Sequence, residues 1–220
     1  MALDRVHLNK LLRLFILKEG PRSTIIKRDA RETLRKQDGE GSSTGGHFQF
    51  PFWKAAKDHA ASKCDLRNEI EDLIDKNWRR KRLYPMLQNG FLSWWNERRR
   101  WINEPISAMP KAIKSSFGFD EIEGIVKVEN LLSLKLGENR YRYIYPYFSE
   151  KPSLTPNAAR LGLWLMGQAL PELDIQDIRI LDIIRGETYS IDKYPLDGTE
   201  EESFRLRYRS ILREWRSHLR

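Results

Sequence analysis

Few of the residues from which metal sites, disulfides and covalent catalytic sites are built occur in this sequence. It contains a single cysteine, Cys64, which excludes an internal disulfide framework and is typical of a reducing compartment. The four histidines are too dispersed for the ligand spacing of a zinc site: they are His7, His47, His59 and His218. The sequence therefore predicts no bound metal and no cofactor.

Catalytic and membrane-spanning motifs are also absent. There is no Gly-x-Ser-x-Gly elbow, no His-Glu-x-x-His pair, and no residue near Cys64 that would mark it as a nucleophile. The apolar run at residues 8–17 is interrupted by Lys10 and Arg13 and is too short to cross a bilayer. The glycines and serines of residues 38–46 predict a flexible loop, without the Gly-Lys-Ser/Thr end of a phosphate-binding loop. These absences favour a cytoplasmic protein that is not an enzyme and does not enter a membrane.

What the sequence has in excess is positive charge, and that charge is unevenly distributed. The net charge is +8, with 39 Lys and Arg against 31 Asp and Glu. Residues 1–101 contain 22 basic and 13 acidic side chains, whereas residues 102–198 contain 11 and 14. The basic excess therefore lies mainly in the first half, which favours a polyanionic partner such as a nucleic acid contacted through its phosphates.

Two basic clusters in this half are the candidate nucleic-acid contacts. The first consists of Arg79, Arg80, Lys81 and Arg82. It lies near the end of residues 62–85, which have the apolar spacing of a helix and a capping-box pattern at Ser62 and Asp65. The alternative interpretation is a solvated helix C-terminus, where the helix dipole favours cations.

The second cluster is part of FLSWWNERRRW, residues 91–101, which combines three tryptophans with three arginines. On a helix at about 100° per residue, the aromatic residues share one arc and are predicted to face a core. Arg98 falls inside that arc, whereas Arg99 lies at its edge and Arg100 opposite. The three arginines cannot form one patch, and Arg99 and Arg100 are the two that we expect to be available for phosphate contacts.

The patterns predict an α+β protein, with a helical N-terminal half followed by a β-hairpin–helix–strand–helix layer. We expect five segments within one compact domain. They are N-terminal helices at 1–37, a flexible loop at 38–50, a basic helical region at 51–104, an α+β core at 105–198 and a C-terminal helix at 199–220.

Alternation and turn residues define the elements of the α+β core. Residues 124–148 are rich in β-branched and aromatic residues and predict a β-hairpin with its turn at 137–139. Residues 177–191 predict a strand, with a possible second hairpin turn. Between them, Thr155 is placed to cap a helix over residues 156–171.

Capping and breaker residues define the terminal helices. The first helix is expected to end at Gly20-Pro21, because a glycine followed by a proline usually stops a helix. A capping box at Thr199 and Glu202 is expected to open the last helix. The apolar face of that helix consists of Phe204, Tyr208, Ile211, Leu212 and Trp215.

Four segments between residues 120 and 191 follow the order strand, strand, helix, strand: GIVKVENLLSLKL, RYRYIYPYF, AARLGLWLMGQALPELD and IRILDIIRGETYSI. This order resembles the core of the PD-(D/E)XK nuclease superfamily, particularly its RecB-like branch. The resemblance implies a similar fold. That family holds Mg²⁺ with an Asp and an acid-x-Lys pair on adjacent strands. Here the first position offers Lys127 or Glu129, and no acid occurs between Arg140 and Ser149. A degenerate core without catalytic residues is therefore expected.

The basic first half and the second half without a catalytic pair favour a non-catalytic nucleic-acid-binding or scaffolding subunit. Such a subunit would have protein partners in a larger intracellular DNA-processing or defence complex of prokaryotic type. One alternative is a metal-dependent nuclease with a migrated site, using Glu123, Glu129 and Glu150 with Lys127 or Lys151. Another is a protein-interaction module whose basic surface meets an acidic partner. Metal-dependent cleavage would identify the first alternative, and comparison of nucleic-acid with protein pull-downs the second.

Overall fold

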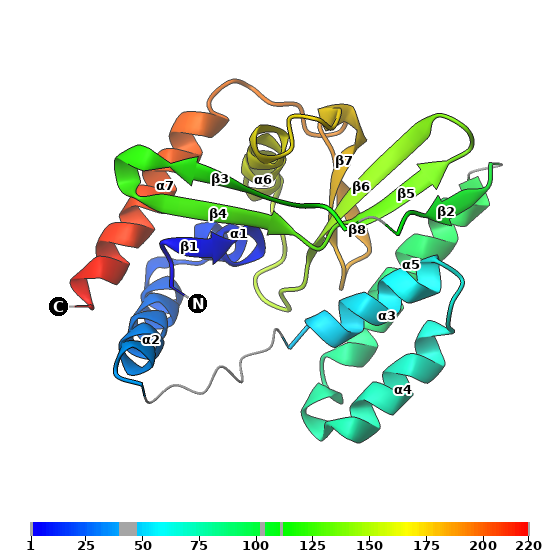
Figure 1. The fold of residues 1–220 in the computed structure, drawn as a ribbon, viewed down its shortest axis with the longest axis horizontal. Helices are drawn as coiled ribbons and strands as arrows, with labels where there is room; N and C mark the ends of the chain where they lie inside the picture. Colours follow the sequence, from blue (N-terminus) through cyan, green and yellow to red (C-terminus); the bar gives the residue numbers. More distant parts are fainter. Residues whose placement is uncertain (1, 40–47, 102–103, 111, 220) are drawn as a thin grey trace.

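The structure, a computed structural model, describes residues 2–39, 48–101, 104–110 and 112–219, with only the backbone described for residues 98–101. Its strands form two sheets (Figure 1). Its buried apolar side chains form two hydrophobic cores. This arrangement confirms the predicted α+β class. Among the described helices, none combines the length and the apolar composition that crossing a bilayer requires.

Seven α-helices lie within the described ranges. They are α1 (Leu8–Ile16), α2 (Glu19–Gln37), α3 (Phe50–Ala60), α4 (Leu66–Lys76), α5 (Tyr84–Trp101), α6 (Pro156–Ala169) and α7 (Glu200–Ser217). Short 3-10 turns are η1 (Trp78–Arg80), η2 (Asp120–Ile122) and η3 (Ile175–Asp177). The strands are β1 (Arg5–His7), β2 (Ile106–Ala108), β3 (Lys114–Phe119), β4 (Gly124–Glu129), β5 (Leu132–Leu136), β6 (Arg140–Tyr147), β7 (Ile178–Asp182) and β8 (Glu187–Tyr189).

The smaller sheet has the order β1-β4-β3 and the larger the order β2-β5-β6-β7-β8. The predicted hairpin turn is confirmed between β5 and β6, where Leu136 pairs with Arg140 across residues 137–139. β6 and β7 are parallel, and α6 provides the crossover connection that parallel neighbours require. A second hairpin joins β7 to β8.

The first arm of the predicted 124–148 hairpin is two strands that belong to different sheets. β4 joins the smaller sheet and β5 the larger, and Asn130 stands between them with φ +67°. Asparagine is one of the few residues that adopts this left-handed conformation readily. The prediction of one continuous arm was therefore wrong.

β6 separates the two cores. Tyr145 and Tyr147 belong to the first core, with side chains of α1, α2, α6 and α7. Ile144, on the opposite face, belongs to the second core, with side chains of α3, α4 and α5. Accordingly, α3, α4 and α5 lie together on one side of the molecule, whereas α1, α2 and α7 lie beside the smaller sheet (Figure 1).

Gly20-Pro21 does not end the first helix. α1 ends at Ile16, and α2 begins at Glu19 and contains both residues. Proline is tolerated there because the backbone N–H groups of a first turn have no partner within the helix. The break between the two helices thus lies at Leu17 and Lys18, three residues before the predicted position.

The helices at the other end of the chain were predicted more accurately. Thr155 caps α6 by accepting a hydrogen bond from the Ala158 N–H, as expected. The predicted apolar face of α7 is buried throughout. The predicted capping box is wrong, because the Thr199 side chain makes no capping hydrogen bond to α7. Instead the buried Glu200 carboxylate accepts hydrogen bonds from the N–H groups of Asp197 and Gly198, each at 3.0 Å.

Candidate nucleic-acid interface

The basic run 79–82 lies on a turn between α4 and α5 and not at the end of a helix. Asp65, rather than Ser62, caps α4 by accepting hydrogen bonds from two backbone N–H groups. α4 stops before Asn77, whose backbone is extended (φ −156°, ψ 99°). The Asn77 side chain accepts a hydrogen bond from the Arg79 N–H at 3.1 Å and so opens η1. The dipole interpretation of this cluster therefore does not apply.

Four residues of this turn project into solvent. The Trp78 indole is 78% exposed, the highest value among the exposed large hydrophobic side chains of the described residues. Arg79, Lys81 and Arg82 are exposed as well. We call these four residues the Trp78 turn. An indole with this exposure contributes little to folding, so its position beside three cations suits contact with another molecule.

Arg80 differs from its neighbours, although the sequence places all four cations together. Its side chain is half-buried, and its Nη1 donates a hydrogen bond to the Leu73 carbonyl oxygen at 2.9 Å. Its guanidinium lies over the Tyr84 ring, 5.4 Å from the centroid. Arg80 therefore ties the turn to α4 and α5, and its role as a phosphate contact stays a prediction.

This difference gives a stability prediction. Arg80→Ala should lower the free energy of unfolding by about 1–2 kcal/mol, through loss of a charged hydrogen bond and a cation–π contact. Arg79→Ala, the matched control, should change it by less than about 0.5 kcal/mol because that side chain is exposed. Urea unfolding of both variants is the measurement, and equal midpoints would show that Arg80 does not hold the turn.

The aromatic stretch that precedes the second basic cluster is buried, as predicted. Phe91, Trp94 and Trp95 are at most 4% exposed, and their rings lie 5.6–6.3 Å apart between centroids. The side chains of Arg98, Arg99, Arg100 and Trp101 lie outside the described part of the chain. The phosphate contacts of Arg99 and Arg100 stay a prediction.

A cleft adjoins the Trp78 turn. Arg82 forms an ion pair with Glu150 at 2.7 Å, in the loop that follows β6. Phe148 and Ser149 of the same loop line a cavity of about 340 Å³ between α1 and α2. A smaller cavity of about 70 Å³ shares His7, Asn9, Gln49 and Phe148 with it. We call the two cavities together the central cleft.

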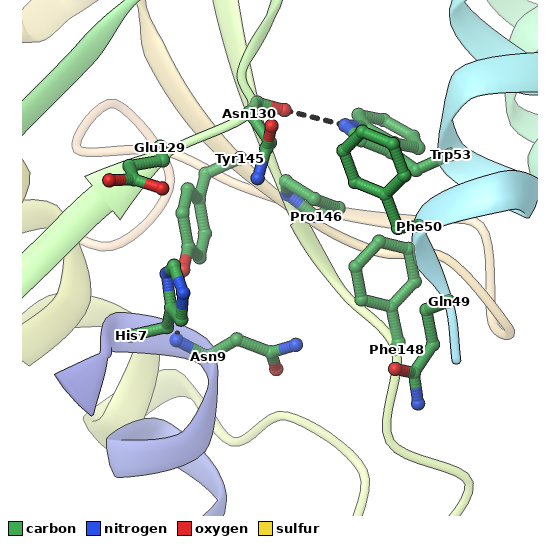
Figure 2. Close-up of a pocket in the computed structure, with 10 residues that line it drawn as sticks. All are labelled: His7, Asn9, Gln49, Phe50, Trp53, Glu129, Asn130, Tyr145, Pro146 and Phe148. Carbon is green, nitrogen blue, oxygen red and sulfur yellow. Dashed lines mark hydrogen bonds between the residues drawn. The ribbon is translucent and has the colours of Figure 1, made fainter. Parts of the chain in front are cut away.

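The smaller cavity is lined by polar side chains and aromatic rings. Figure 2 shows His7, Asn9, Glu129 and Tyr145 on one side and Gln49, Phe50 and Phe148 on the other. The Asn9 backbone N–H donates a hydrogen bond to the Tyr145 hydroxyl at 2.9 Å. Burial raises the pKa of Tyr145, so its hydroxyl stays protonated and neutral at physiological pH.

The three acids of the migrated nuclease site do not come together. Glu129 lines the smaller cavity, whereas Glu123 pairs with Arg216 at 3.2 Å and Glu150 with Arg82. Glu123 directly precedes β4 and Glu129 is its last residue, so the two lie about 20 Å apart at about 3.3 Å per residue. Within the described residues, no three His, Cys, Asp or Glu side chains are placed to hold a metal ion.

No protein-family model matches this chain, and no curated protein sequence matches it. The resemblance to PD-(D/E)XK nucleases stays a prediction. The Trp78 turn and the central cleft are therefore the features that bear on function. Sequence reasoning found the cations of the turn but missed Trp78 and Phe50, which is 49% exposed at the cleft. The signal that could have found Trp78 is its position directly before the basic run.

Proposed function

We propose that this protein is a non-catalytic nucleic-acid-binding subunit that contacts its ligand through the Trp78 turn. The observation that carries the proposal is the 78% exposed indole of Trp78 next to the exposed cations Arg79, Lys81 and Arg82. Arginine and lysine side chains neutralise phosphates, and an exposed aromatic ring can stack on an unpaired base. A single-stranded segment would use both kinds of contact at once.

The surroundings of the turn support a site that extends beyond four residues. Arg82 leads to the central cleft through Glu150, which a phosphate would displace from the arginine. The cleft then offers Phe50 as a further exposed ring and Arg13 and Arg28 as further cations. We propose that a bound nucleic-acid strand runs from the Trp78 turn toward Phe50.

The test is binding of fluorescent single-stranded and duplex oligonucleotides over a range of salt concentrations. Replacing Arg79, Lys81 and Arg82 together by glutamine should reduce the slope of log K against log[salt] by about 2–3, because each phosphate contact contributes about 0.7–0.9. Trp78→Ala should weaken single-strand binding by about 1–3 kcal/mol and duplex binding by less, because duplex bases are already stacked. Neither change should alter thermal stability, since the side chains are exposed.

A matched control removes the same charge elsewhere. Arg31, Arg35 and Lys36 are exposed on α2, and their replacement by glutamine should leave the salt slope near that of the unaltered protein. Equal losses in both triple variants would show that net charge, and not the Trp78 turn, determines binding. Absence of binding at low salt for DNA and RNA alike would overturn the proposal in favour of an acidic protein partner.

The non-catalytic part of the proposal is supported by the scattered acids. Glu123 and Glu150 each form an ion pair with an arginine, and β6 carries no carboxylate from Arg140 to Tyr147. We propose that catalysis, where the protein takes part in it, resides in other subunits of a larger complex. Mg²⁺- or Mn²⁺-dependent cleavage that Glu129→Ala abolishes would contradict this and restore the nuclease alternative.

A further inference from the structure

A separate pocket lies on the face of the five-stranded sheet that α5 covers. Its volume is about 330 Å³. Its polar lining includes three arginines from neighbouring strands, Arg140, Arg142 and Arg179. We call it the arginine pocket.

Strand register explains why these arginines share one face with core residues. Arg140 pairs with Leu136 and Arg142 with Leu134 across β5 and β6, so each cation projects beside a leucine. Arg179 pairs with Ile144 across β6 and β7. The same sheet face is therefore apolar along β5 and cationic along β6 and β7.

The three arginines differ in how deeply their side chains are buried. The exposed side-chain fraction falls from 55% at Arg140 to 29% at Arg142 and 8% at Arg179. An anion entering the pocket would therefore meet Arg140 and Arg142 first.

Each of the three guanidinium groups is paired with one carboxylate. Arg140 pairs with Glu104 at 2.8 Å, Arg142 with Asp177, and Arg179 with Asp192 at 2.8 Å. Of these three acids only Asp192 lines the pocket, so among the described residues its charged lining is three arginines and one aspartate. A guanidinium has five N–H donors, and one carboxylate leaves donors of Arg140 and Arg142 for a second anion.

The opposite wall is aromatic and fixed in place. Trp94 and Trp95 of α5 face the leucines of β5 across the pocket. α5 is anchored nearby because Gly90 packs directly on the backbone of residues 183 and 184. The Trp94 indole Nε1 and the Thr188 hydroxyl, on two lining residues, are buried and make no hydrogen bond within the described part of the chain. Buried polar groups normally have partners, so these two groups, one on α5 and one on β8, are unusual among the lining residues.

We propose that the arginine pocket binds one nucleotide unit, with its phosphate on Arg140 and Arg142 and its base against the apolar lining of the pocket. Guanidinium groups match phosphate geometry, and a lining of aromatic and aliphatic side chains suits a base. The volume is at the lower end of small-molecule sites, about 300–1,000 Å³, which admits one nucleotide and excludes a duplex.

The pocket is distinct from the Trp78 turn. The Trp78 turn precedes α5, whereas Trp94 and Trp95 are about 15 Å further along that helix at 1.5 Å per residue. The proposal does not depend on the proposed function. The chemistry of the arginine pocket fits a free nucleoside monophosphate as well as the 5′-phosphorylated end of a nucleic-acid strand. The experiment below separates these two sources.

The experiment is isothermal titration of the full chain with AMP, GMP, CMP and UMP, with the matching nucleosides and with inorganic phosphate. At least one monophosphate should bind at least about tenfold more tightly than its nucleoside, because charge-assisted contacts require the phosphate. Arg140→Gln should weaken that binding by about tenfold. It should keep the melting temperature, since its ion pair with Glu104 is exposed. Arg142→Gln should weaken binding further but removes a partly buried pair, so Arg140→Gln is the deciding variant.

Arg79→Gln is the matched control, because it removes one exposed arginine of the Trp78 turn and should leave monophosphate affinity unchanged. Competition by a 5′-phosphorylated tetranucleotide, but not by its unphosphorylated form, would identify a strand end as the ligand. Binding of the monophosphate without such competition would identify the free nucleotide. Equal affinity for nucleoside and monophosphate, unchanged affinity in Arg140→Gln, or no saturable binding at millimolar ligand would overturn the proposal, whatever the oligonucleotide assays of the Trp78 turn give.

Discussion

Gly90→Ala should destabilise the protein by more than about 3 kcal/mol, because the added methyl group would collide with backbone. A Cβ at position 90 would lie 2.0 Å from the Ile183 carbonyl oxygen and 2.5 Å from that of Ile184. Neither atom can turn aside as a flexible side chain would, so α5 would have to move away from the β7–β8 connection. Calorimetry should show a melting temperature lower by about 6–12 °C or more for a chain of this size.

Gly20→Ala is the matched control for this change. Gly20 also lies within a helix, but a Cβ there would meet nothing within 4 Å. That variant should be unchanged or more stable by up to about 1 kcal/mol, because alanine favours a helix more than glycine does. If Gly90→Ala melted with the unaltered protein, α5 could not pack as closely on the larger sheet as the structure indicates.

Trp164→Ala should also destabilise the protein strongly, lowering the free energy of unfolding by about 3–5 kcal/mol. The Trp164 indole is 8% exposed and its ring lies 6.1 Å from Phe117, 6.4 Å from Phe119 and 5.7 Å from Phe204 between centroids. It thereby joins α6 to β3 and α7, and its removal would leave a cavity that three elements border. Chemical denaturation with a fitted free energy of unfolding is the measurement.

Leu206→Ala serves as the control for the tryptophan change. Leu206 is on α7 close to the same core but is 55% exposed, so its truncation should cost less than about 0.5 kcal/mol. A Trp164→Ala protein with the native unfolding midpoint would mean that α6 is a docking face for another protein. The interaction-module alternative would then gain support over the nucleic-acid proposal.

Elements with long, regular patterns were predictable from the sequence. α6 has its proline and threonine at the start and apolar residues all round, and α7 repeats its apolar residues at helical spacing. β1 and β2 could not be found in the same way. Each has three residues, and β1 exists because it pairs with β4, more than a hundred residues later. A strand this short has no local sequence pattern from which it could be predicted.

The candidate site shows the same limit at the level of single side chains. Charge alone identified the run 79–82, but the burial of Arg80 depends on Leu73 and Tyr84, which only the folded chain places beside it. Trp78 follows Ile74 by four residues, so a continuing helix would have carried it on the apolar stripe of α4. The extended backbone of Asn77 ends that helix and turns the indole outward.

One hydrogen bond joins residues from opposite ends of the sequence. The buried Tyr208 hydroxyl donates to the Leu3 carbonyl oxygen at 2.7 Å, across 205 residues of chain. During synthesis, β1 and α1 leave the ribosome long before α7, which fills the first core with Phe204, Tyr208 and Trp215. The nascent N-terminal segment must therefore expose apolar surface until translation has passed Trp215. A chaperone or an early-binding partner that covers this surface would raise the yield of folded protein.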